Sequence, residues 1–140
     1  MTDAVAQLLP LFPAVPLIAA AFALLAPWRA VRDSIMLIIP GMGIFAGLGL
    51  LMYTMNNGVV AHTVGLYQGN VGIPFAADAF SALMIITTMI VAFGANWFAI
   101  AGGETKSRFY PSLTLILITG VCGALLTADL FNFFVFIEVM

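Results

Sequence analysis

The chain has 140 residues, of which 64% are hydrophobic and only 7% are charged, against roughly 25% charged residues in soluble domains. With four Lys and Arg residues and a net charge of −2, it lacks the basic surface that neutralises a phosphate backbone, which excludes nucleic-acid binding. The single cysteine, Cys122, cannot form an internal disulfide or a cysteine-ligated metal cluster, so we expect a buried thiol, no cofactor and no metal.

Four long uncharged intervals predict transmembrane helices, at residues 8–26, 34–55, 79–101 and 111–127. Each approaches the 20 or so apolar residues that cross a hydrocarbon layer of about 30 Å. A fifth helix is predicted over residues 130–140, but eleven residues rise only about 16 Å. The expected fold is an all-α membrane protein, a polytopic bundle of four full spans and the first half of a fifth. We expect residues 1–140 to be an N-terminal transmembrane segment, completed by further sequence or by a second polypeptide.

Prolines cluster at the start of the first span, at Pro10, Pro13 and Pro16. A first helical turn tolerates proline because its N–H groups have no partner within the helix. Pro16 lies deeper, so we expect the first helix to bend there.

Basic residues occur only in segments 28–33 and 102–110, the connections that follow the first and third spans. These two connections lie on the same side of the membrane, and the positive-inside rule makes that side cytoplasmic. The N-terminus is then expected outside. Trp28, Tyr53, Trp97 and Tyr110 lie near the predicted span ends, as interfacial aromatic residues do.

Small residues spaced four apart predict close helix packing. Gly43 and Gly47 form a G-x-x-x-G pattern in the second span, and Gly120 and Ala124 form a similar pair in the fourth.

The outside loop, residues 56–77, predicts a short β-hairpin. Residues 62–67 alternate in polarity, residues 71–75 follow, and Gln68-Gly69-Asn70 lies between them as a turn. An open two-stranded edge is not tolerated in lipid, so the hairpin is expected outside the hydrocarbon layer. His62, the only histidine, is expected to be a solvated loop residue.

Asp78 and Asp129 each precede an apolar span immediately, as N-cap residues do. Thr87 and Thr88, in the middle of the third span, are expected to bond the carbonyls of the preceding turn. Asn132 is expected to form a hydrogen bond with an adjacent helix.

Glu138 is the candidate functional residue. Nine helical residues separate it from Asp129 at the interface, which places it about 13 Å deep, where an ionisable group marks a functional site by default. Phe131, Phe134 and Val135 are expected to share its face and to desolvate the carboxylate, which favours its protonated form. Such a group can exchange protons. No Lys or Arg of this chain is expected at that depth.

The segment T-A-D-L-F-N-F-F-V-F-I-E, residues 127–138, resembles the start of the fifth helix in the D subunit of Mrp-type multisubunit Na⁺/H⁺ antiporters. The stretch from Pro74 to Leu83, the proline-rich first helix and the small residues 120–123 match the same family. The resemblance implies that Glu138 exchanges protons with a lysine two helices further on. It also implies a bacterial cell membrane as the location. The implied partners are the remaining helices of the same subunit, other subunits of the complex, the bilayer, and Na⁺ and H⁺ as transported ions.

Two alternatives remain open at this point. The related antiporter-like subunits of respiratory complex I share the glutamate, so the chain is alternatively a proton-translocating membrane-arm subunit of an NADH–quinone oxidoreductase. A third hypothesis is a structural glutamate that pairs with a neighbour and never titrates. An ionised carboxylate at the membrane centre costs roughly 3 kcal/mol on insertion scales, which favours a function for Glu138.

Overall fold

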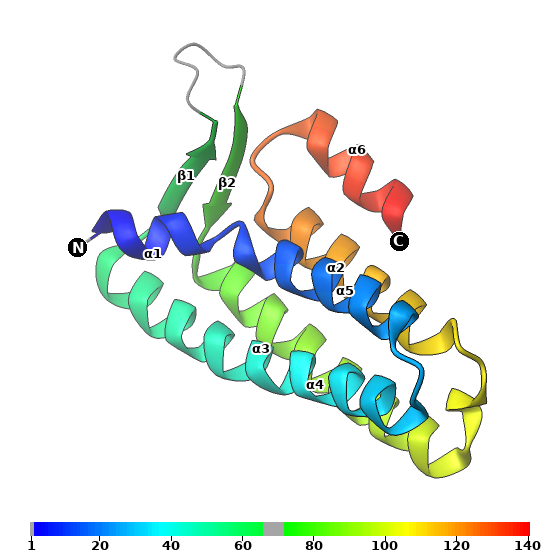
Figure 1. Cartoon of the computed structure of the whole chain (residues 1–140). Helices are drawn as coiled ribbons and strands as arrows, with labels where there is room; N and C mark the ends of the chain where they lie inside the picture. Colours follow the sequence, from blue (N-terminus) through cyan, green and yellow to red (C-terminus); the bar gives the residue numbers. More distant parts are fainter. Residues whose placement is uncertain (1, 66–71) are drawn as a thin grey trace.

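The computed structural model describes residues 2–65 and 72–140, and in this part of the chain six α-helices are joined by short connections and one β-hairpin (Figure 1). The elements are α1 (Thr2–Leu8), α2 (Leu11–Leu25), α3 (Arg29–Asn57), β1 (Val60–Val64), β2 (Ile73–Ala77), α4 (Ala79–Gly102), the 3₁₀ turn η1 (Glu104–Lys106), α5 (Tyr110–Leu126) and α6 (Leu130–Val139).

Among the described residues, three helical segments are long and apolar enough to cross a membrane: Ala4–Leu25, which contains most of α1 and all of α2, then α3 and α4. The apolar helix α5 has 17 residues, at the short end of the range for a spanning helix, and α6 has ten. The predicted class, a polytopic helical membrane protein, is confirmed.

The long helices lie side by side in a bundle, in which α3 packs mainly against α4 and α2 packs mainly against α5 (Figure 1). Glycines permit the first of these contacts. A Cβ atom at Gly43 would lie 2.6 Å from the sulfur of Met89, and one at Gly47 would lie 2.8 Å from the Ile86 side chain. The close packing predicted from Gly43 and Gly47 is therefore confirmed.

The first span is interrupted at Leu9 and Pro10, whereas α2 continues through Pro16. Proline has no backbone N–H, so Pro10 and Pro13 cannot form the usual four-residue helical bonds. The local bonds instead span three residues, from Leu9 N to Ala6 O and from Phe12 N to Leu9 O, each 3.2 Å. The cluster of prolines therefore interrupts the first span at Leu9 and Pro10, and the bend expected at Pro16 stays a prediction.

The predicted hairpin forms at one end of the bundle (Figure 1). Strands β1 and β2 pair antiparallel, with His62 opposite Phe75. The first strand is Val60–Val64 rather than 62–67, and His62 is partly buried within it rather than free in a loop. The predicted turn at Gln68-Gly69-Asn70 lies outside the described residues.

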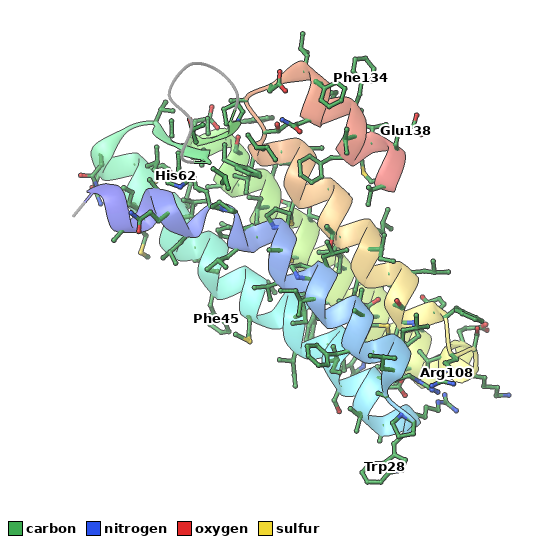
Figure 2. The ribbon with its side chains drawn as sticks, turned by 45° about the horizontal axis from the view of Figure 1, so that its top comes forward. Trp28, Phe45, His62, Arg108, Phe134 and Glu138 are labelled. Carbon is green, nitrogen blue, oxygen red and sulfur yellow. The ribbon has the colours of Figure 1, made fainter. Side chains whose placement is uncertain are left out.

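The basic residues gather at the opposite end of the bundle, where Arg108 is labelled in Figure 2. Arg29 Nη2 donates to Thr105 Oγ1 at 2.9 Å, and Arg29 pairs with Asp33 at 3.5 Å. Arg108 Nε donates to the carbonyl of Leu24 at 3.1 Å, in the last turn of α2. The bond from Arg29 to Thr105 joins the two basic segments, although Arg29 belongs to the first turn of α3 and not to a loop as expected.

A buried polar contact links α3 to α4. Pro40 lies inside α3, and because it has no N–H, the carbonyl of Met36 four residues earlier lacks its helical donor. The fully buried Asn96 of α4 supplies one, since its Nδ2 donates to Met36 O at 3.0 Å. A carbonyl left without a donor in a hydrocarbon layer costs several kcal/mol by typical estimates, so Asn96 compensates for Pro40.

Candidate functional site

The candidate site starts at residues 127–129, which connect α5 to α6. Asp129 Oδ2 accepts hydrogen bonds from Asn132 N at 3.3 Å and from Asn132 Nδ2 at 3.0 Å. The predicted N-cap is therefore confirmed, whereas Asn132 forms no bond to another helix among the described residues and bonds Asp129 instead. The cap carboxylate lies one turn before Asn132 on the same helix and reaches both its donors.

Helix α6 runs back along α5, and glycines set how closely the two helices approach. A Cβ atom at Gly123 would overlap the ring of Phe136, and one at Gly120 would lie 2.9 Å from the carbonyl oxygen of Phe136. The fourth-span prediction of close packing is thus confirmed for Gly120. Its partner in the contact is Gly123 rather than the predicted Ala124.

This packing determines where Glu138 points. Glu138 is two residues after Phe136, about 200° around the helix, so it lies on the side of α6 opposite to α5. Phe131 and Phe134 share that side and are 74% and 66% exposed. Figure 2 shows Phe134 and Glu138 directed away from the bundle.

The expected desolvation of Glu138 stays a prediction, because this face of α6 is exposed among the described residues. Phe131, Phe134 and Val135 lie within about 60° of it around the helix, as predicted, but all three are exposed. Among the described residues, no hydrogen bond or ion pair involves the carboxylate of Glu138. Its chemistry thus depends on what covers this face of α6.

The other polar residues of the spans have structural roles. Asp78 caps α4 by accepting the backbone N–H of Ser81 at 2.7 Å, which confirms the prediction and holds the pKa of this carboxyl below its ordinary value. Thr87 and Thr88 donate to the carbonyls of Leu83 and Met84 four residues earlier, also as predicted.

Two contacts of this arrangement were not predicted from the sequence. Asn96 was not singled out, although a polar side chain within an apolar span and a proline in a neighbouring span were both visible signals. The contact of Phe136 with Gly123 was also missed; the G-x-x-G spacing of Gly120 and Gly123 was its available signal.

No family model matches the chain, whereas several curated relatives do. The D subunit of the Na⁺/H⁺ antiporter of Alkalihalophilus pseudofirmus is 36% identical over 136 residues, covering 90% of this chain and 26% of the relative. The corresponding D subunit of Bacillus subtilis is 37% identical over 95 residues, covering 66% of this chain and 19% of the relative. The D subunit of a probable K⁺/H⁺ antiporter of Rhizobium meliloti is 42% identical over 81 residues, covering 54% and 15%.

A chain in the structure of the Mrp complex from a Dietzia species superposes with a TM-score of 0.91 at 41% identity, covering 96% of this chain and 26% of that one. The chain is homologous to part of the D subunit of Mrp antiporters. It spans about a quarter of the length of the relatives that it matches over most of its own length.

An archaeal membrane-bound sulfane sulfur reductase contains the same fold, with a TM-score of 0.80 at 23% identity, covering 96% of this chain and 28% of that one. The names of the curated relatives are those of transporter subunits. Together with the three long apolar helical segments among the described residues, these matches support a multi-pass membrane chain.

Proposed function

We propose that this chain is part of a D-type subunit of a multisubunit Na⁺/H⁺ antiporter in the bacterial cell membrane. It works there with the remaining helices of that subunit and with the other subunits of the complex, and Glu138 carries protons along the transport path. The observation that supports this role most directly is an acidic side chain in an apolar helix, about 13 Å beyond its cap at Asp129 and turned away from the helices that would hold it structurally.

The orientation of Glu138 favours proton transfer over a structural pair within this chain. A carboxylate with a purely structural role would be expected to face α5. The hydroxyl groups of Ser112 and Thr119 in α5 donate to backbone carbonyls of the helices and not to Glu138. Glu138 faces outward between Phe131 and Phe134. The partner that exchanges protons with it therefore comes from another segment that covers this face of α6, and a lysine there would be the appropriate chemistry.

The relatives' names favour an antiporter over a membrane-arm subunit of a quinone reductase. They include both sodium and potassium exchangers, so the proposed preference for sodium is tested against potassium in the same assay.

The decisive experiment measures cation-driven proton movement in everted membrane vesicles that contain the whole complex. Glu138→Gln is expected to abolish exchange while the complex still assembles, because the amide keeps the shape of the side chain but cannot release a proton. Glu104→Gln, an exposed glutamate in η1 at the far end of the bundle, is the matched control and should retain exchange. Exchange that survives Glu138→Gln at equal levels of the complex would reject the proton-carrying role.

We also propose that the end of the bundle with the four basic residues faces the cytoplasm and that the hairpin faces outside, as the positive-inside rule predicts. Single cysteines at exposed positions Lys106 and Ala61 test this in a background from which Cys122 and every cysteine outside residues 1–140 have been removed. An impermeant maleimide added to intact cells should label only the variant with cysteine at position 61. Labelling of only the variant with cysteine at position 106 would show that the topology is the opposite of the one proposed.

A further inference from the structure

The hairpin and helix α6 are joined by a set of contacts at the α5–α6 connection. The backbone N–H of Ala128 donates to the carbonyl of Pro74 at 3.0 Å, and Phe75 pairs with Thr127 as an isolated antiparallel bridge. Strand β2 therefore pairs with β1 along one edge and with the α5–α6 connection along the other, and it fixes the backbone from which α6 begins. In Figure 1 the start of α6 lies beside this strand.

Side-chain contacts also connect the hairpin to α6 and α5. Phe75 is only 5% exposed although its strand lies at the end of the molecule, and its ring centroid is 6.5 Å from that of Phe136 at an interplanar angle of 55°. Phe136 in turn lies against Gly123, where any side chain would overlap its ring. Phe136 is thus held on two sides, by α5 and by β2.

We infer that Phe75, Phe136 and Gly123 form a clamp that sets the rotation of α6, and that the two phenylalanines are positioning residues for Glu138. The physical reason is that a helix with one large side chain seated between two fixed surfaces cannot turn about its axis without removing that side chain. Since Glu138 lies about 200° from Phe136, the clamp determines the direction of the carboxylate. This inference rests on the proposed function of Glu138 and identifies the residues that set the direction of its carboxylate.

The backbone contacts of the connection and the side-chain clamp fix different features of α6. The hydrogen bond from Ala128 to Pro74 and the bridge at Thr127 fix where the helix begins. The contact of Phe136 with Gly123 fixes its rotation and its distance from α5. A displacement of about 1 Å at a reacting group can lower a rate about 100-fold, so even a small rotation should reduce exchange.

The test introduces Gly123→Ala into the assembled complex, because the new Cβ forces Phe136 from its place. Gly94→Ala is the matched control, since nothing lies within 4 Å of a Cβ at that glycine. Gly123→Ala is expected to lower exchange about 10-fold or more and Gly94→Ala to leave it unchanged. Adding Phe136→Leu to Gly123→Ala should restore part of the exchange, because the smaller side chain leaves room for the methyl group.

A second readout does not depend on transport. A hydrophobic carbodiimide labels protonated carboxyl groups within membranes, and mass spectrometry gives its rate of reaction with Glu138. Gly123→Ala should change this rate several-fold, and the double variant should return it toward the wild-type value. A purely structural role of Gly123 would lower complex levels without this rescue. Unchanged labelling and exchange in an assembled Gly123→Ala complex would overturn the clamp.

If Gly123→Ala prevents assembly, Phe75→Leu tests the clamp from the hairpin side, with the 76% exposed Phe45 of α3 as control, Phe45→Leu. Altered labelling of Glu138 in Phe75→Leu alone supports the inference, and equal labelling in both variants overturns it. Should Glu138→Gln retain exchange, the proposed function fails, but the labelling comparison still decides whether the clamp positions residue 138.

Discussion

The bond between Asn96 and the carbonyl of Met36 makes a quantitative prediction about helix packing. Asn96→Leu keeps the size of the side chain but removes the donor, which leaves a buried acceptor beside Pro40. An unsatisfied buried group costs about 1–3 kcal/mol, whereas hydrogen bonds between membrane helices average about 0.6 kcal/mol with a maximum near 1.7. We expect a loss of about 1 kcal/mol, because Asn96 is fully buried but its own Oδ1 has no partner among the described residues.

A Pro40→Ala background tests whether this loss arises because Asn96 replaces the donor that Pro40 lacks. Pro40→Ala restores an N–H that can bond Met36 O within α3, so Asn96→Leu should then cost close to zero. The assay is equilibrium unfolding in mixed micelles, followed by circular dichroism, where 1 kcal/mol changes the equilibrium constant about fivefold. Asn56→Leu, at an exposed position whose amide also bonds a helical carbonyl, is the control and should stay within about 0.5 kcal/mol. An equal cost of Asn96→Leu in both backgrounds would refute the compensation of Pro40 by Asn96.

Two further predictions concern packing and capping. Gly43→Leu should destabilise the bundle by about 1–3 kcal/mol because its side chain must displace Met89, while Gly94→Leu, which meets open space, should be nearly neutral; a comparable loss of the unfolding free energy in both would contradict the packing argument. Asp78→Ala should cost about 1 kcal/mol near pH 7, since the cap to Ser81 is lost. The pKa of Asp78 lies below its ordinary value of 3.8, so its contribution is complete above that value and disappears as the pH falls through the lowered pKa. Unfolding measured at successive pH values should therefore show wild type and Asp78→Ala converging in acid, and a constant difference would exclude the charged cap.

Local features of this protein follow from the sequence because their partners are close along the chain. The caps at Asp78 and Asp129 bond residues three positions later, and Thr87 and Thr88 bond carbonyls four positions earlier. The apolar spans follow from long uncharged intervals, and the hairpin follows from a short alternating pattern. Glu138 also stands out from the sequence alone, because an ionisable residue within an apolar helix is rare and costly.

The relations between helices were decided only by tertiary packing. Asn96 and Met36 are 60 residues apart, and nothing local to Asn96 indicates that Pro40 has freed the carbonyl that it bonds. The outward direction of Glu138 depends on which face of α6 packs against α5. An apolar helix with phenylalanines on several sides has no single hydrophobic face to predict it. The contact of Phe136 with Gly123 selects that face, because only a glycine allows the ring to lie so close to the α5 backbone.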